Sequence, residues 1–178
     1  MGIDALVFSS QKALALPPGL SMIVISPRLV SRLEGDGPRA HYLGLRRHLV
    51  DMQRGQTPFT PAVGTILQLH TRLKTLMGVG AEGSVKRVRA LAEHFREGLG
   101  GMPLRIFPER PSNGLTALSP LNGRSALEIY QALRTGYGLV VTPNGGTLRD
   151  TVFRVGHMGN IRESDLDRVL AALRKVVT

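Results

Sequence analysis

The chain has 178 residues, and its 23 basic residues against 13 acidic residues give a formal net charge of +10. Its 42% hydrophobic and 20% charged residues are typical of a globular protein and exclude general disorder. No cysteine is present, which removes disulfide frameworks, thiolate metal sites, iron–sulfur clusters and cysteine nucleophiles from this chain. The lack of thiols is compatible with a reducing cytoplasm, and we expect a cytoplasmic protein.

The basic charge is compatible with nucleic-acid binding, but its distribution argues against it. Runs of basic residues never exceed two, and aromatic residues make up only 4% of the chain, too few for base-stacking platforms. The apolar stretch from Ala13 to Ile25 is interrupted by Pro17-Pro18-Gly19 and is too short to span a bilayer. Asp4 stands where a secretory signal carries basic residues. We therefore expect neither a nucleic-acid nor a membrane partner.

The N-terminal part of the chain predicts two short buried strands, over residues 3–8 and 20–25. The segment between them is rich in turn residues and carries Lys12, which would lie at a strand end. Burial at that place would favour the uncharged, nucleophilic form of the amine, which is able to form a Schiff base. The alternative is an ordinary solvated lysine on a surface loop.

The next part of the chain is predicted to contain a short helix and a long connection. Pro27 opens a helix through residue 34, which Gly35-Asp36-Gly37-Pro38 ends. Residues 39–60 are polar with little periodicity, as in a loop that is functional or wraps a partner. Thr60, directly before Pro61, has the sequence context of a helix N-cap.

The remainder predicts two amphipathic helices and then a small α+β layer. Apolar residues fall on one helical face over residues 62–76 and again over 85–99, with a glycine-containing junction at 78–83. Asn160 and Glu163 are spaced as a capping box before the last helix. We expect a division into residues 1–83 and 84–178. The elements predicted after residue 100 are strands at 104–107 and 115–118, a helix at 125–134, and strands at 139–142 and 152–155.

Several segments, in order, resemble one enzyme family. The segment from Asp4 to Leu14 contains Ser10-Gln11-Lys12 and is followed by Pro17-Pro18-Gly19-Leu20. It resembles the cofactor-lysine segment of the class V pyridoxal-phosphate (PLP) aminotransferases, in the alanine–glyoxylate, serine–glyoxylate and serine–pyruvate branch. The resemblance covers essentially the whole chain. It continues through Tyr42-Leu43-Gly44-Leu45, where relatives often have Tyr-Leu-Asp-Leu, through residues 56–63, and through Phe153-Arg154-Val155-Gly156-His157-Met158-Gly159.

The resemblance implies an α/β fold, namely the C-terminal part of a fold-type I PLP-dependent transferase. This part comprises the end of the large-domain sheet, in residues 1–83, and a small α+β domain, in residues 84–178. Lys12 would hold PLP as a Schiff base and move the substrate proton, while Gln11 would contact the cofactor. Arg154 would bind the substrate carboxylate through its planar fork of donors. Gln56, Thr57 and Thr60 would contact the cofactor phosphate of the partner subunit in a homodimer, in a register uncertain by one residue.

The implied activity is transfer of an amino group from alanine or serine to glyoxylate or pyruvate. Family members are about twice as long as this chain, and their upstream half carries the phosphate loop, the stacking aromatic residue and the aspartate beside the pyridine nitrogen. We therefore expect an incomplete half. The alternatives are a 2-aminoethylphosphonate–pyruvate type of transaminase and a non-catalytic basic fragment that binds a partner. The five histidines, His157 included, form no cluster with metal-ligand spacing, so we expect no metal.

Overall fold

The computed structural model describes residues 2–35 and 40–178. By contacts between Cα atoms the chain divides into two compact units, Met1–Thr75 and Leu76–Thr178. The sequence placed a division after residue 83, whereas the contacts place it after Thr75. Helix α3 (Val63–Glu97) crosses this boundary.

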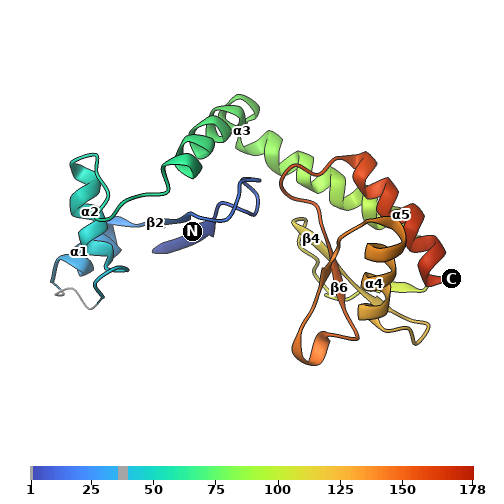
Figure 1. Ribbon diagram of the computed structural model, residues 1–178. Coiled ribbons are helices and arrows are strands. Elements are labelled where there is room, and N and C mark those ends of the chain that lie inside the picture. The colour runs from blue at the N-terminus through green and yellow to red at the C-terminus, as the bar shows by residue number, and fades with distance from the viewer. Residues whose placement is uncertain (1, 36–39) are drawn as a thin grey trace. The chain divides into compact units, whose positions relative to one another are not determined.

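The first unit contains a two-stranded antiparallel sheet, with β1 (Ala5–Ser9) paired to β2 (Ser21–Ile25) (Figure 1). The prediction of two strands is confirmed, but the prediction that they are buried is wrong. Leu6 is 53% exposed and Val24 is 58% exposed. An apolar run of this kind is buried only when both faces of its sheet are covered, and the described residues of this unit do not supply that cover.

Helix α1 (Pro27–Gly35) follows β2 and has a well-defined start. Ser26 accepts a hydrogen bond from the backbone N–H of Leu29 (3.2 Å) and donates its hydroxyl to Asp4 Oδ1 (2.7 Å). Pro27 occupies the first helical position, where its missing N–H costs nothing. The residues expected to end the helix, Asp36, Gly37 and Pro38, lie outside the described residues.

A second helix, α2 (Leu45–Gln53), occupies part of the segment that the sequence predicted as a long connection. That prediction is wrong because Leu45, Leu49 and Met52 follow a helical spacing that the neighbouring basic residues mask. Gly44 forms the N-cap, and a Cβ there would lie 2.7 Å from the carbonyl oxygen of Ala40. The tight turn before α2 thus explains why this chain has glycine at position 44.

Helix α3 covers both amphipathic helices that the sequence predicted. Its only non-helical residue is Gly80, with φ 79° and ψ 160°, a conformation that only glycine adopts readily. The expected junction at 78–83 is therefore a break at one residue. The prediction that Thr60 caps this helix is wrong, because the helix begins at Val63, whose N–H donates to the carbonyl of Pro61 (2.9 Å).

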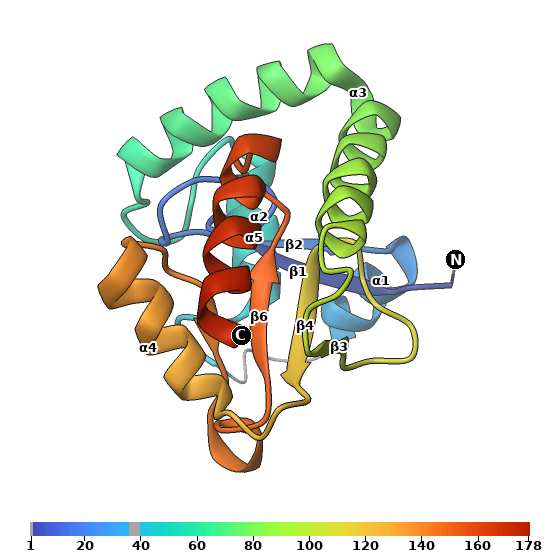
Figure 2. The same ribbon diagram turned by 90° about the vertical axis from the view of Figure 1, so that its right-hand side faces the viewer.

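The second unit is a four-stranded antiparallel sheet in the order β3-β4-β6-β5. Helices α4 and α5 and the C-terminal part of α3 pack on one face of this sheet (Figures 1 and 2). The α+β layer is confirmed, although the strand expected at 139–142 is only a two-residue strand. The elements are β3 (Leu104–Ile106), β4 (Leu115–Pro120), α4 (Ala126–Tyr137), β5 (Thr142–Pro143), a 3-10 turn (Gly146–Leu148), β6 (Phe153–Gly156) and α5 (Glu163–Val177).

Among residues 2–35 and 40–178, the hydrophobic core lies entirely in this second unit. Its largest fully buried side chains come from α3, the sheet, α4 and α5, and they include Phe95, Leu118, Ile129, Leu133, Phe153, Leu166 and Leu173. Helix α4 begins at Ser125, whose hydroxyl oxygen accepts from the N–H of Leu127 (3.1 Å).

Helix α5 begins two residues later than the sequence predicted. The expected capping box of Asn160 with Glu163 is wrong, because Arg162 occupies the N-cap and its backbone N–H donates to Asp165 Oδ2 (2.9 Å). An acidic side chain in the first turn also suits the positive end of the helix dipole. Among the helices of the described residues, none has the length and apolarity needed to cross a membrane.

Candidate active site

Lys12 lies in a turn of residues 10–14 directly after β1, at the strand end that the sequence predicted. The backbone carbonyl of Lys12 accepts from the N–H of Ala15 (2.9 Å), which closes the turn. The side chains of Gln11 and Lys12 are both exposed. The burial expected for Lys12 is therefore wrong for this chain, and its amine is accessible to a small molecule.

Ser10 closes the loop that carries Lys12. This residue is fully buried, and its N–H donates to the carbonyl of Leu20 (3.1 Å) while its hydroxyl donates to the carbonyl of Pro17 (2.7 Å). Arg72 of α3 contacts the same loop, because its Nε donates to the carbonyl of Leu14 (3.1 Å). Two residues distant in sequence from each other thus hold the backbone around Lys12.

The segment with Gln56, Thr57 and Thr60 is exposed and held by its own turn. The Thr57 hydroxyl donates to the carbonyl of Phe59 (2.7 Å), and the Gln56 N–H donates to the carbonyl of Asp51 (3.0 Å). Thr60 makes no side-chain hydrogen bond within the described part of the chain. Phe59 fixes the turn through three neighbours: the Tyr42 ring at 4.7 Å, the His41 ring at 5.5 Å and the Arg47 guanidinium at 4.8 Å.

Arg154 lies in β6, between Ala117 of β4 and Thr142 of β5 in the sheet register. One of its terminal nitrogens donates to the carbonyl of Pro143 (3.2 Å), which anchors the guanidinium. Its Nε is buried and has no hydrogen-bond partner among the described residues. A buried donor without a partner is costly, and a carboxylate accepting from a guanidinium is the group best suited to satisfy it.

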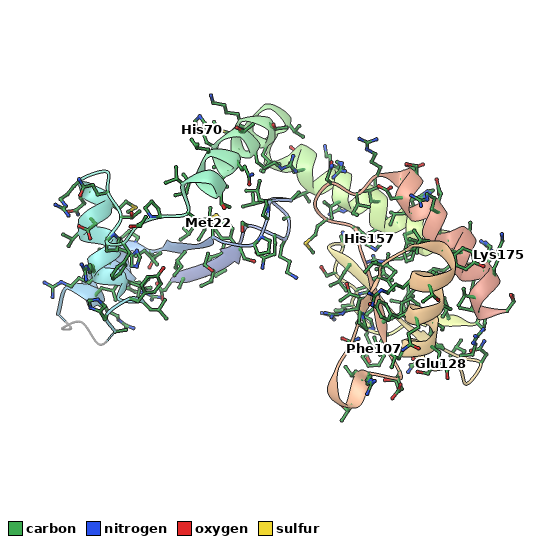
Figure 3. The ribbon with its side chains drawn as sticks, in the orientation of Figure 1. Met22, His70, Phe107, Glu128, His157 and Lys175 are labelled. Atoms are coloured by element: carbon green, nitrogen blue, oxygen red, sulfur yellow. The ribbon has the colours of Figure 1, made fainter. Side chains whose placement is uncertain are left out.

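His157, Thr116 and Arg96 form a polar cluster next to the strand that carries Arg154. The sequence did not predict this cluster. His157 is fully buried, and its Nε2 lies 2.8 Å from the hydroxyl of Thr116, which also accepts from Arg96 Nε (3.1 Å). Figure 3 shows the His157 side chain inside the second unit. Burial, with a smaller effect of the Arg96 charge, lowers the pKa of His157 to about 4. The neutral imidazole therefore belongs to the core at neutral pH.

The predicted site residues fall into both units. Gln11, Lys12 and the 56–60 segment belong to the first unit, whereas Arg154 belongs to the second.

Across the described residues, no hydrogen bond joins the Lys12 turn to the 56–60 segment. Nor does any group of three or more potential metal ligands occur in residues 2–35 and 40–178. Of the supporting residues, Ser10 belongs to the Ser10-Gln11-Lys12 motif, although the sequence analysis gave it no role, and Arg72 belongs to no motif.

Comparison with known proteins finds several aminotransferases among the relatives of this chain. The chain is 27% identical over 99% of its length to the small subunit of a soluble hydrogenase from Synechococcus, and 31% identical over 96% to an uncharacterised aminotransferase of Methanocaldococcus jannaschii. It is 30% identical over 99% of its length to the alanine–glyoxylate aminotransferase of rabbit, Oryctolagus cuniculus. These matches cover 46%, 46% and 47% of the relatives, so the chain spans about half the length of the relatives it matches. No protein-family model matches the chain.

Solved structures agree with the sequence comparisons. An aspartate aminotransferase of subgroup IV from Thermus thermophilus superposes with a TM-score of 0.87 at 28% identity, over 99% of this chain and 49% of that one. A pyridoxamine–pyruvate aminotransferase from Mesorhizobium loti gives a TM-score of 0.86 at 27% identity, over 97% and 46%. The fold is that of the C-terminal half of a fold-type I aminotransferase.

Proposed function

Because this chain corresponds in sequence and fold to the C-terminal half of the class V aminotransferases, we propose that it is the lysine-bearing half of a PLP-dependent transaminase. The complete enzyme would transfer the amino group of alanine or serine to glyoxylate or pyruvate. The observation that carries the proposal is Lys12, which is held with its amine exposed on a closed loop at a strand end. Such a lysine supplies the nucleophile that the cofactor aldehyde requires.

The side chains present fit this cofactor and a carboxylate substrate. PLP, when bound, supplies an electron sink for the substrate α-carbon. Lys12 would attach the cofactor, give it up to the substrate amine, and then hold the proton removed from the α-carbon. Arg154 would bind and orient the substrate carboxylate through its guanidinium. Gln11 would remain a neutral polar contact beside the cofactor.

The hydrogen bonds of the 56–60 segment also indicate which of its two threonine hydroxyls would contact the cofactor phosphate. A hydroxyl must donate its proton to bind a phosphate oxygen, but the Thr57 hydroxyl already donates to the carbonyl of Phe59. Thr60 is exposed, and its hydroxyl is not committed to a partner in the described residues. We therefore assign the hydroxyl contact to Thr60 and a supporting role in the turn to Thr57. In a homodimer these contacts would reach the cofactor of the partner subunit.

The hydrogenase names of two relatives, each covered to 46%, do not by themselves assign a second function to this chain. The lysine loop and the Arg154 strand would each have a direct role in amino transfer. The residues available therefore favour the transaminase.

Reconstitution with the missing half tests the proposal. The chain would be mixed with PLP and a separate polypeptide equivalent to the remaining half of an alanine–glyoxylate aminotransferase, and pyruvate formed from alanine and glyoxylate would be measured. Lys12→Ala is expected to abolish transfer, and Arg154→Ala to weaken use of carboxylate substrates by about 2–4 kcal/mol. Lys86→Ala, in an exposed ion pair with Glu82, is the matched control and should retain activity.

Full activity of the Lys12→Ala assembly would show that the assignment is wrong. A preference for an aminophosphonate donor over alanine, in the same assay, would identify the 2-aminoethylphosphonate type of transaminase instead. Salt-sensitive binding of nucleic acid without uptake of PLP would favour the non-catalytic basic fragment.

A further inference from the structure

The loop from Ser10 to Leu20 is closed at both ends through a single residue. Ser10 uses every polar group it has: its N–H donates to the carbonyl of Leu20 (3.1 Å), and its carbonyl accepts from the N–H of Leu16 (3.0 Å). Its hydroxyl donates to the carbonyl of Pro17 (2.7 Å) and accepts from the N–H of Leu20 (3.3 Å). A fully buried serine with all its hydrogen bonds satisfied within one loop fixes the path of that loop.

A second contact holds the loop from outside. Arg72 of α3, 58 residues from Leu14, donates its Nε to the Leu14 carbonyl (3.1 Å). Around this attachment the Ala15 N–H donates to the Lys12 carbonyl (2.9 Å) and closes a turn, and Ala15, the residue after Leu14, has a positive φ of 55°. A residue other than glycine adopts this conformation only where its surroundings enforce it.

We propose that Ser10 and Arg72 are positioning residues that hold Lys12 ready for its cofactor before the cofactor binds. This inference rests on the proposed function of Lys12 and extends it to two residues that do not touch the amine. Preorganisation of this kind lowers the entropic cost of bringing a nucleophile to its target. The two residues act on the same loop, so their effects should be less than additive.

The lysine content of the chain provides a direct test, because it has only four lysines, Lys12, Lys74, Lys86 and Lys175. A lysine-specific protease would be applied to the intact native chain, and the cleavage rate after each lysine followed by mass spectrometry. Ser10→Ala leaves the Pro17 carbonyl and the Leu20 N–H without their hydroxyl partner, and is expected to accelerate cleavage after Lys12 about tenfold. Arg72→Ala should act in the same direction, and Ser10→Thr, which keeps the hydroxyl, should restore slow cleavage.

Arg87→Ala is the matched control. Arg87 also lies on α3, but its guanidinium donates to the carbonyls of Gly159 and Ile161 in the second unit. This substitution should leave cleavage after Lys12 unchanged. Unchanged cleavage after Lys12 in Ser10→Ala would overturn the proposal. Equal acceleration after Lys12 and Lys74 would overturn it too, because that result indicates general unfolding of the first unit.

A second readout follows the chemistry of the amine. PLP would be added at a limiting concentration and reduced with borohydride, and the rate of modification of Lys12 compared with that of Lys175. Ser10→Ala is expected to lower this ratio about tenfold while Ser10→Thr preserves it, and an unchanged ratio in Ser10→Ala would overturn the positioning role. If wild-type Lys12 were not modified at all, the proposed function would fail, whereas the protease result would still decide whether Ser10 orders the loop.

Discussion

At the scale of single residues, His157 connects the strand of Arg154 to the core. Its ring lies 5.2 Å from Phe95, its Nε2 contacts Thr116, and its backbone N–H donates to the carbonyl of Gly114 (3.0 Å). These contacts join α3, β4 and the end of β6. An uncharged, buried histidine therefore packs against the strand that carries Arg154.

The charge state of His157 predicts a loss of stability in acid. Since burial lowers its pKa from 6.5 to about 4, the unfolded chain takes up a proton below pH 6.5 that the folded unit resists. Stability of the second unit should fall as the pH drops from 6.5 to 4, by up to about 3 kcal/mol, and then level off. Urea unfolding of the wild type and of His157→Leu, followed across this range, measures the difference.

His94 provides an internal control, because its pKa is shifted in the opposite direction to the pKa of His157. Its hydrogen bond to Asp167 (2.7 Å), assisted by the charges of Glu163 and Glu97, raises its pKa above 6.5. The stabilisation from this pair is present below pH 6.5 and is lost as the pH rises through the raised pKa. NMR titration should therefore show His94 changing above pH 6.5 and His157 near pH 4. A His157 resonance that titrates near 6.5 would contradict the buried cluster.

At the scale of elements, Gly80 interrupts α3 without any steric reason. No atom lies within 4 Å of the place where a Cβ would stand, so only its backbone conformation requires glycine. Gly78, two residues earlier, is helical and equally unobstructed. The two glycines differ in backbone angles alone.

Substitution of these glycines by alanine should have opposite effects. Gly78→Ala should stabilise the chain by up to about 1 kcal/mol, because alanine is the better helix former. Gly80→Ala should destabilise it by about 1–3 kcal/mol or straighten the helix. Circular dichroism and thermal unfolding measure both changes. Stabilisation by Gly80→Ala without added helix content would contradict the break at this residue.

The sequence predicted those elements whose signals are local. The spacing of Val88, Leu91 and Phe95 predicted the C-terminal part of α3, and the turn residues around Lys12 predicted its place after a strand. Helix α2 was missed because basic residues mask a short apolar period. The burial of β1 was predicted wrongly because burial depends on residues that cover a strand, and these need not be its neighbours in sequence. The contact from Arg72 was missed for the same reason, because its partner Leu14 is 58 residues away.

At the scale of the whole molecule, the two units differ in what stabilises them. Every buried apolar side chain of the described structure lies between Leu91 and Val177, in the second unit. In the first unit the buried residues are Ser10 and Asp51, both polar. A two-stranded sheet with exposed apolar faces is marginally stable unless something covers it. The first unit thus has the properties expected of part of a larger domain.

This difference predicts unfolding in two steps. Hydrogen exchange under increasing urea should release the amides of β1 and β2 at a lower concentration than those of β4 and α5, because the first unit buries little apolar surface. Without urea the Ser10 loop should remain protected by its hydrogen bonds. A single transition shared by peptides from both units would contradict this account.

The proposed transaminase depends on Lys12 being the cofactor lysine. The most direct measurement is to add PLP to the purified chain, reduce it with borohydride, and map the modified lysine by mass spectrometry. We predict modification of about one lysine per chain, at Lys12, and its loss in Lys12→Arg. Equal modification of Lys74, Lys86 and Lys175, unaffected by Lys12→Arg, would contradict the account.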